Sequence, residues 1–506
     1  MHQDLNQTIT DFKAYLERMT MFGQAMSIIG YDAETIAPPG GIAMRAKRAG
    51  FFGLEVFNMS TSSVMKGFLD TLTPHLDTLD KPLQAMVRKC KKSYDAGTKI
   101  PPEKVREFAA LRTEAGDVWV KARQENNFAM FAPYLKRLID MSKELLALRA
   151  DELPAGGVPY DILLDDYEEG MTVAKYDDFF NKLKAVVVPL IKQIAQSGKK
   201  IDRSFASAKV ETETQRVLSK MLAEKIGYDL TRGYIGETAH PFCTGPEKTD
   251  VRITTRYDEK DFLSSLYSIL HECGHAIYEQ NIADDIANTM LGSGTSMGIH
   301  ESQSRFYENV IGRSPAFWEY ITDDLKAVLP KSFGDVTSHM FFEAVNESKP
   351  SLIRVEADEL TYSLHVIIRY EIEKMIFAGE VAVDDLPALW NAKYQEYLGV
   401  SSPTDADGVL QDIHWSMGAF GYFPTYALGS AYAAQLLHYM KKDMDVDALV
   451  AKGDFAKITS WLTEKIHRYG SIYTPNELMA MNFGEELNGE YFAEYLRDKF
   501  EKLYSL

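Results

Sequence analysis

Apolar residues that recur at three- and four-residue spacing run through most of this sequence and constrain its fold more than any other feature. Such stripes occupy residues 5–19, 128–148 and 353–372. This spacing matches the turn of an α-helix and gives each helix one apolar face to bury. The sequence therefore predicts a mainly α-helical fold.

Two segments depart from this pattern. Residues 227–257 are rich in Thr, Gly, Tyr and Ile, and residues 251–255 alternate as a strand does, so we expect a small sheet or hairpin there. Residues 153–171 carry three glycines and two prolines among acidic residues and form the most loop-like connection. We expect a single unit over residues 1–506, in which an N-terminal helical lobe of about residues 1–155 packs on a body of about residues 156–506.

The charge balance excludes several classes of partner. Lys and Arg number 55 against 73 Asp and Glu, which gives a formal net charge of −18. A chain this acidic is a poor match for nucleic acid or for an anionic membrane surface. No run of about 18 apolar residues appears, the N-terminus lacks the features of a signal peptide, and three scattered cysteines do not suggest disulfides. We expect a soluble, cytoplasmic protein.

The strongest chemical signal is H-E-x-x-H, at His271, Glu272 and His275, within a segment predicted as a helix over residues 264–279. A spacing of four places both imidazoles on one helix face, where they can bind one metal ion. Glu272 is offset around the helix and can act as general base on a metal-bound water. The alternative is an amphipathic helix whose histidines make only local hydrogen bonds. We expect Cys273 to be a packed thiol rather than a ligand.

Glu301 is the downstream candidate for a third metal ligand, 26 residues after His275. Thr295 or Ser296 could cap the helix that carries it. Because Arg305 follows four residues later, a surface ion pair between these two side chains is the more ordinary interpretation of Glu301 from the spacing alone. The neighbouring His300 should project to a different side of this helix.

Two further segments are rich in polar or aromatic groups. In residues 350–374 a polar stripe follows helical spacing, and it is either a solvated face or an arginine held by an aspartate to grip a carboxylate. The stripe consists of Arg354, Asp358, Thr361 and His365. Residues 408–426 combine His, Trp, Tyr and Gly, which by itself is typical of a packed aromatic loop.

Taken together, these segments resemble the carboxypeptidase Taq family of metallocarboxypeptidases. The similarity extends over most of the chain. Six signatures occur in the family's order: His240-Pro241-Phe242, Asp250-x-Arg252-x-Thr254, His271-Glu272-Cys273-Gly274-His275, His300-Glu301-Ser302-Gln303, Ile353-Arg354-x-x-Ala357-Asp358 and Gly408-x-x-Gln411-Asp412-x-His414-Trp415.

The resemblance implies a two-lobed helical zincin of the neurolysin or thimet oligopeptidase type, with a small β-sheet beside a deep active-site cleft, and a homodimer. It implies that Glu301 is the third metal ligand and that Arg354 receives the C-terminal carboxylate of the substrate. Further residues would line the site and bind substrate or stabilise the oxyanion: His240, His414 and Tyr422. Others would support it: Asp250, Arg252, Asp358, Gln411 and Asp412.

The expected reaction is removal of single amino acids from the free C-terminus of a peptide. One divalent ion per subunit, Zn²⁺ in the first place and Co²⁺ or Mn²⁺ as alternatives, would activate a water molecule. Glu272 would take its proton and return it to the leaving amine. A helical oligoendopeptidase is the alternative within the peptidases, and a non-catalytic metal-binding helical protein is the alternative outside them.

Overall fold

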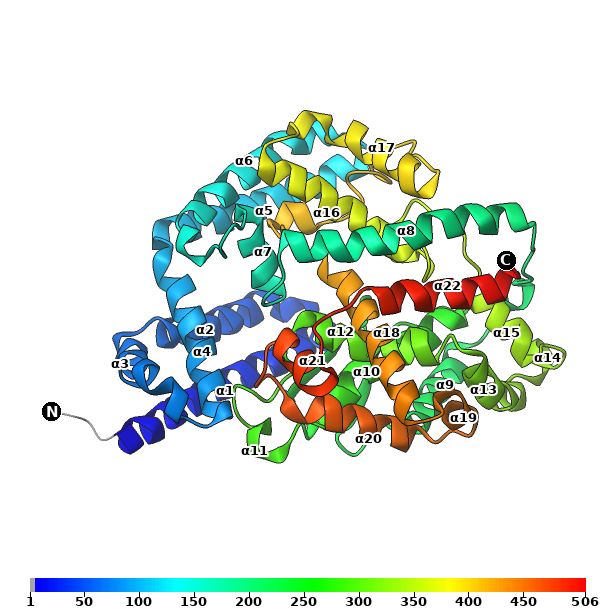
Figure 1. Ribbon diagram of the computed structural model, residues 1–506, viewed down its shortest axis with the longest axis horizontal. Coiled ribbons are helices and arrows are strands. Elements are labelled where there is room, and N and C mark those ends of the chain that lie inside the picture. Colours follow the sequence, from blue (N-terminus) through cyan, green and yellow to red (C-terminus); the bar gives the residue numbers. More distant parts are fainter. Residues whose placement is uncertain (1–4) are drawn as a thin grey trace. The chain divides into compact units, whose positions relative to one another are not determined.

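The structure is a computed structural model that describes residues 5–506 (Figure 1). It is mainly helical with one small three-stranded sheet, so the predicted fold class is confirmed. Over residues 5–506, none of the helices combines the length and the apolar character that a membrane span requires.

The chain divides into two compact units, each built from three separate segments. The first unit contains Met1–Thr98, Asp202–Ala344 and Tyr439–Glu486, and the second contains Lys99–Ile201, Val345–His438 and Leu487–Leu506. Residues 1–155 therefore contribute to both units. The lobe boundary expected near residue 155 does not coincide with any of these changes of unit.

Helices make up most of both units. Those of the first unit are α1 Leu5–Thr35, α2 Ile42–Ser60, α3 Ser63–Leu72, α4 Lys81–Lys99, α9 Thr212–Lys225, α10 Phe262–Gln280, α11 Asp284–Ala287, α12 Met297–Arg305, α13 Pro315–Val328, α14 Pro330–Phe333, α15 Ser338–Val345, α19 Val446–Ala451, α20 Phe455–Lys465 and α21 Pro475–Phe483. Those of the second are α5 Pro102–Gln124, α6 Phe128–Ala147, α7 Pro159–Tyr167, α8 Val173–Ser197, α16 Tyr362–Ala378, α17 Leu386–Leu398, α18 Thr425–Asp443 and α22 Glu490–Tyr504. Helices α4 and α15 each extend one residue across a unit boundary, and α18 extends from the second unit into the first at Tyr439.

The expected small sheet lies in the first unit. Its strands are β1 Gly233–Glu237, β2 Cys243–Glu247 and β3 Asp250–Thr255, in the order β1-β3-β2. β1 runs parallel to β3, with Ile235 opposite Ile253, and β2 runs antiparallel to β3. β3 carries most of the buried residues of this sheet, and it packs against α10.

Helix α10 lies at the centre of the first unit and is buried on nearly every side. Leu266, Ile269, Leu270 and Ile277 are all buried, as the stripe predicted from the sequence requires. The helix begins after Asp261, whose carboxylate accepts a hydrogen bond from the backbone N–H of Ser264. A helix fixed in this way can hold polar side chains in a defined direction.

The helical polar stripe expected within residues 350–374 does not form. Residues Arg354–Glu356 make a short 3₁₀ turn, and α16 begins only at Tyr362. The reason is Asp358, whose carboxylate accepts hydrogen bonds from the backbone N–H groups of Leu360 and Thr361 and from the Thr361 hydroxyl. A side chain that satisfies the backbone in this way replaces the helical hydrogen bonds.

The connection over residues 153–171 is also more regular than expected. It contains α7, which begins at Pro159. Asp161 stabilises the start of α7 by accepting a hydrogen bond from the backbone N–H of Val158 at 2.8 Å. Proline at the first helical position is favourable because its missing N–H would have no partner there.

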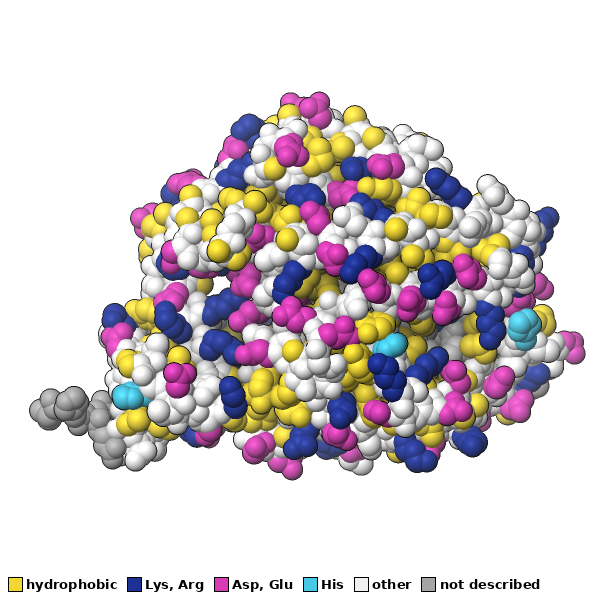
Figure 2. Space-filling view, in the orientation of Figure 1, with side chains coloured by type: hydrophobic (Ala, Val, Ile, Leu, Met, Phe, Trp, Pro, Cys, Tyr) yellow, Lys and Arg dark blue, Asp and Glu magenta, His cyan; other side chains and the backbone are white. Residues whose placement is uncertain are grey.

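The three cysteines form no disulfide, as expected, and charged side chains of both signs lie on the face shown in Figure 2. Cys90, Cys243 and Cys273 are free thiols, and Cys273 is fully buried. Basic and acidic side chains alternate over the face shown in Figure 2. The excess of acidic residues is therefore not gathered into one patch on this face.

Candidate metal centre

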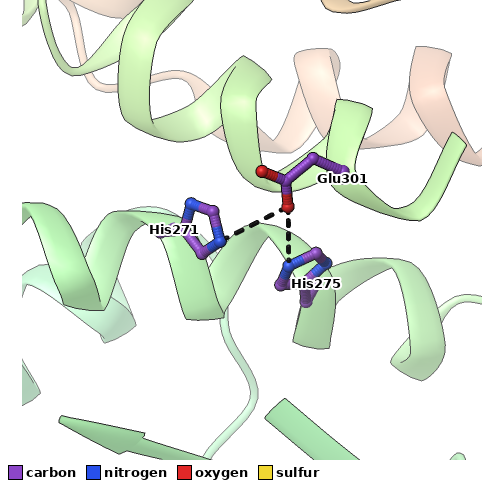
Figure 3. Close-up of side chains that lie close together, drawn as sticks. All are labelled: His271, His275 and Glu301. Carbon is purple, nitrogen blue, oxygen red and sulfur yellow. Dashed lines mark ion pairs between the residues drawn. The ribbon is translucent and has the colours of Figure 1, made fainter. Parts of the chain in front are cut away.

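Two helices of the first unit approach each other closely where the H-E-x-x-H segment lies. A Cβ atom at Gly274 of α10 would lie 2.6 Å from the Cα of Ser304 on α12, so only glycine fits this crossing. α12 begins after Ser296, whose hydroxyl accepts a hydrogen bond from the backbone N–H of Ile299. The close crossing brings Glu301 over the two histidines of α10 (Figure 3).

His271, His275 and Glu301 form a set of three donors that could hold a metal ion. One ligand atom from each lies within 4.8 Å of the others. Oε2 of Glu301 is 3.5 Å from Nε2 of His271 and 3.4 Å from Nε2 of His275. Two ligands at zinc distances and a tetrahedral angle stand roughly 3.3 Å apart. The three side chains therefore fit a divalent ion between them.

The Nδ1 atom of each imidazole already lies at hydrogen-bond distance from another side chain. Nδ1 of His271 lies 2.8 Å from a carboxylate oxygen of Glu308. Nδ1 of His275 lies 2.6 Å from Nδ1 of His300. Both rings are thus oriented with Nε2 toward Glu301, which is the arrangement that metal-binding histidines require.

Glu301 combines the two roles that the sequence left open. Its Oε1 accepts a hydrogen bond from Nε of Arg305 at 2.7 Å, so the expected i, i+4 ion pair does form. Its Oε2 faces both imidazoles and accepts a hydrogen bond from the Ser304 hydroxyl at 3.0 Å. The arginine therefore orients the carboxylate without blocking the oxygen that faces the histidines.

The charges around the three donors shift their protonation. Burial raises the pKa of the Glu301 carboxyl, but Arg305 and His271 outweigh this effect and hold that pKa well below its usual range. Burial lowers the pKa of His275 to about 4. At His271 burial acts in the same direction, but nearby carboxylates, above all Glu301, raise the pKa to about 9. Carboxylates thus stabilise the protonated form of His271, whereas the His275 imidazole is neutral.

Glu272 lies beside these donors and is only 6% exposed. Burial raises the pKa of its carboxyl to about 7, and His271 opposes this shift. A carboxyl with a pKa near neutrality can both accept and return a proton. This property suits the general base that the motif predicts.

The first signature lies in the connection before β2, and the second lies on β3, next to α10. The Asp250 carboxylate pairs with the Arg252 guanidinium through two hydrogen bonds of 2.7 and 2.6 Å. The Thr254 hydroxyl accepts a hydrogen bond from the backbone N–H of Phe242, which joins the two signatures. His240 lies in the exposed bend before β2. Asp250 and Arg252 thus support the strand, and His240 is accessible.

Arg354 belongs to a buried charged cluster in the second unit. Its Nε and Nη2 donate to Oδ1 of Asp412, while Arg369 donates to Oδ2 of the same carboxylate. Nη1 of Arg354 donates to the hydroxyl of Tyr362. Asp412, rather than the expected Asp358, is therefore the partner of Arg354. One aspartate shared by two arginines leaves one positive charge that Asp412 does not balance.

Gln411 and His414 complete this cluster. Oε1 of Gln411 accepts hydrogen bonds from the backbone N–H of Arg354 and from Arg369. His414 packs against Tyr422, with 5.3 Å between the ring centres, and its Nε2 lies 3.1 Å from the hydroxyl of Tyr426. The second unit thus brings together Arg354, Gln411, Asp412, His414 and Tyr422, all of which the sequence marked.

Several residues of these clusters were not identified from the sequence. Glu279 follows His275 by four residues and Glu308 follows Glu301 by seven, so each spacing places the pair on one helix face. Those spacings were a usable signal. Arg369 likewise follows His365 by four residues on α16, but its partner Asp412 lies 43 residues further along the chain, so no local spacing indicated that contact.

Comparisons with known proteins agree with this geometry. The chain matches the family model described as carboxypeptidase Taq (M32) metallopeptidase over residues 11–500. It is 45% identical to carboxypeptidase 1 of Bacillus subtilis and 36% identical to thermostable carboxypeptidase 1 of Thermus thermophilus, in both cases over 98% of each chain. The crystal structure of the M32 carboxypeptidase from Deinococcus radiodurans superposes with a TM-score of 0.93 at 34% identity, covering 99% of this chain and 100% of that one.

Proposed function

Because the chain belongs to the carboxypeptidase Taq (M32) family and is a metallocarboxypeptidase, we propose that it removes single residues from the free C-terminus of peptides, with Glu272 as general base and Arg354 as carboxylate receptor. The observation that carries the proposal is the donor set of His271, His275 and Glu301 with the buried Glu272 beside it. Three protein ligands leave a fourth position for water or substrate, as in catalytic zinc sites.

The metal would be held by Nε2 of the two histidines and by Oε2 of Glu301. We propose Zn²⁺, and the same donors also accept Co²⁺ or Mn²⁺. When bound, the ion would acidify a water molecule and polarise the carbonyl of the last peptide bond. His271 and His275 must be neutral at Nε2 to bind it, so metal and protons compete for this site.

Glu272 would move the proton in this reaction. It would accept the proton from the attacking water and donate it to the amine of the departing residue. Its buried position supports the role, because a carboxylate with little surrounding water is a stronger base than an exposed one. His240, His414 and Tyr422 are proposed to bind substrate or to offset the charge on the tetrahedral oxyanion.

Arg354 would restrict the reaction to the last residue of a peptide. A guanidinium can bind a carboxylate through two parallel hydrogen bonds, and the unbalanced positive charge of its cluster favours an anion. A local cation is needed, because a chain of net charge −18 repels a carboxylate at long range. Asp412 fixes the arginine, and Asp358 fixes the turn that follows it.

Two further properties are proposed on the family resemblance and on composition. The protein would be a homodimer, which light scattering coupled to size-exclusion chromatography would test. It would work in the cytoplasm, since its three free thiols suit a reducing compartment. Peptides with a free C-terminus are its proposed partners, with neither nucleic acid nor membranes among them.

The proposal is tested by mass spectrometry of one unstructured peptide in two forms, with a free and with an amidated C-terminus. We expect a ladder that shortens by one residue at a time from the free C-terminus, no cleavage of the amide, and loss of all cleavage with a chelator. Internal cuts in both peptides would contradict the exopeptidase and favour an oligoendopeptidase. Bound zinc without any cleavage would contradict catalysis altogether.

A further inference from the structure

The two histidines of the metal centre are supported in different ways. His271 reaches a carboxylate directly, through Glu308 at 2.8 Å. His275 reaches one only through a second imidazole: its Nδ1 lies 2.6 Å from Nδ1 of His300, and Nε2 of His300 lies 2.7 Å from Oε1 of Glu279. An imidazole between a metal ligand and its carboxylate is unusual and needs an explanation.

Metal binding at His275 determines where the hydrogen atoms lie in this series of hydrogen bonds. When Nε2 of His275 gives its lone pair to an ion, the hydrogen of that ring must be on Nδ1. Nδ1 of His300 must then be the acceptor of this hydrogen bond. The hydrogen of His300 is therefore on Nε2, where it is donated to the carboxylate of Glu279.

Packing holds His300 in this position. Its ring lies against the rings of His275 and Tyr278, with centres 4.7 and 5.2 Å apart. A Cβ atom at Gly294 would lie 2.8 Å from the Tyr278 ring and would also overlap His300, so this backbone closes over both rings. The backbone N–H of Gly294 also donates a hydrogen bond to Oε1 of Glu279, which fixes the carboxylate at the end of the hydrogen-bonded series His275–His300–Glu279.

We propose that His300 and Glu279 are positioning residues, which together hold His275 as an Nε2 ligand and increase its basicity; this inference rests on the proposed metal-dependent function. The charge of Glu279 acts through a neutral imidazole, so its influence on His275 is weaker than that of Glu308 on His271. The main task of His300 is to accept the Nδ1–H of His275 and thereby to select its tautomer.

The first test measures zinc affinity by competition with a chelator. His300→Ala leaves Nδ1–H of His275 without its acceptor, and we expect zinc to bind about 10- to 100-fold more weakly. Glu279→Gln keeps an oxygen acceptor but removes the charge, and we expect a smaller loss than for Glu308→Gln. His339→Ala is the control, because this histidine of the same unit has a 73% exposed side chain and should leave zinc affinity unchanged.

The second test observes the tautomers directly, by ¹⁵N NMR of the zinc-loaded protein with labelled histidine. We expect the hydrogen on Nδ1 of His275 and on Nε2 of His300, and we expect Glu279→Gln to retain both. A hydrogen on Nδ1 of His300, or an unchanged zinc affinity in both His300→Ala and His300→Gln, would overturn the proposed positioning role of His300 and Glu279. Such a result in a protein that still binds zinc and cleaves peptides would leave the proposed function intact.

Discussion

Glu272 lies one residue after the first imidazole of the metal centre and is not part of the donor set. Glu272→Gln keeps the size of this side chain and removes only its ability to accept a proton. We expect kcat to fall about 10²- to 10⁴-fold, the range that general base catalysis supplies, while zinc affinity changes little. Steady-state kinetics and a metal titration on the same preparation check this, and near-normal turnover would contradict the mechanism.

Arg354 can be removed without leaving a buried carboxylate alone, since Arg369 still pairs with Asp412 at 2.6 Å. We expect Arg354→Ala to lower kcat/KM for peptides with a free C-terminus about 10- to 100-fold, the value of a hydrogen bond to a charged group. Any slow cleavage of amidated peptides should change far less. Equal losses on both substrates would remove Arg354 from the proposed role.

Arg354→Lys is the matched control for this prediction. It retains the positive charge but loses the planar fork that binds a carboxylate through two hydrogen bonds. We therefore expect it to fall between the wild type and the alanine variant in kcat/KM for free C-termini. A lysine variant equal to wild type would indicate attraction by charge alone.

Individual residues were predictable from the sequence where one helix carries the whole pattern. His271, Glu272 and His275 share α10, so their spacing alone placed them together. Glu301 was ambiguous because its pairing with Arg305 is also real. The contact between His275 and His300 depends on how closely α10 crosses α12 at Gly274, which no local pattern expresses.

At the scale of elements, Glu373 of α16 ties the segment around His414 to two helices. Its carboxylate accepts hydrogen bonds from Nε1 of Trp415 at 2.8 Å, from the backbone N–H of Gly421 at 2.7 Å and from the hydroxyl of Tyr160 in α7 at 2.7 Å. The side chain is fully buried. Glu373 therefore fixes both ends of residues 415–421, the segment that directly follows His414.

This carboxylate should make stability depend on pH. Burial raises the pKa of Glu373 to about 7, against 4.5 for an ordinary Glu, although its three donors act in the opposite direction. Between these values the folded state binds more protons than the unfolded state, so the free energy of unfolding decreases as pH rises from about 4.5 to 7. The protonated Glu373 carboxyl makes its full contribution to the free energy of unfolding only below that pH range.

Glu373→Gln removes the titration, so calorimetry of both proteins between pH 4.5 and 8 isolates its effect. We expect the difference in unfolding free energy to move in favour of the variant by up to about 3 kcal/mol as pH rises. At pH 4.5 the variant should be less stable than the wild type, because the NH₂ group of its glutamine cannot accept hydrogen bonds from the three groups that donate to Glu373. A difference that does not vary with pH would contradict the assigned protonation.

The bounds of a helix were predictable where the apolar spacing alone determines them. They were not predictable where a single side chain sets the start or the end of the helix. The stripe at residues 128–148 corresponds closely to α6, which spans Phe128–Ala147. The stripe at residues 353–372 predicted too long a helix, because Asp358 satisfies the backbone before α16 begins. Similarly, Pro159 marks the start of α7 within an expected loop.

At the scale of the whole molecule, the sequence could not predict how the chain is divided. Each unit is assembled from three segments, so contacts between residues far apart in the sequence decide its membership. A single boundary chosen from local composition cannot describe such an arrangement. The helical class was predictable, in contrast, because it depends only on local spacing.

This division predicts which helices and strands should become less stable when the metal is removed. His271, His275 and Glu301 all belong to the first unit, whereas Arg354 and Glu373 belong to the second. A ligand that binds only the folded state stabilises it by about 4 kcal/mol at a thousand times its Kd. We expect zinc to slow amide hydrogen exchange strongly in α10, in α12 and in β3, and to leave α6, α8 and α16 nearly unchanged.

Hydrogen exchange measured by mass spectrometry, with zinc and with a chelator, tests this expectation segment by segment. Glu301→Ala serves as the control, because it removes a donor and should abolish the difference between the two conditions in the first unit. Protection of α6, α8 and α16 equal to that of α10 would show that the two units open in one cooperative step. Protection confined to the first unit would instead mean that each unit opens by itself, so that metal loss loosens the hydrolytic centre while the Arg354 cluster stays folded.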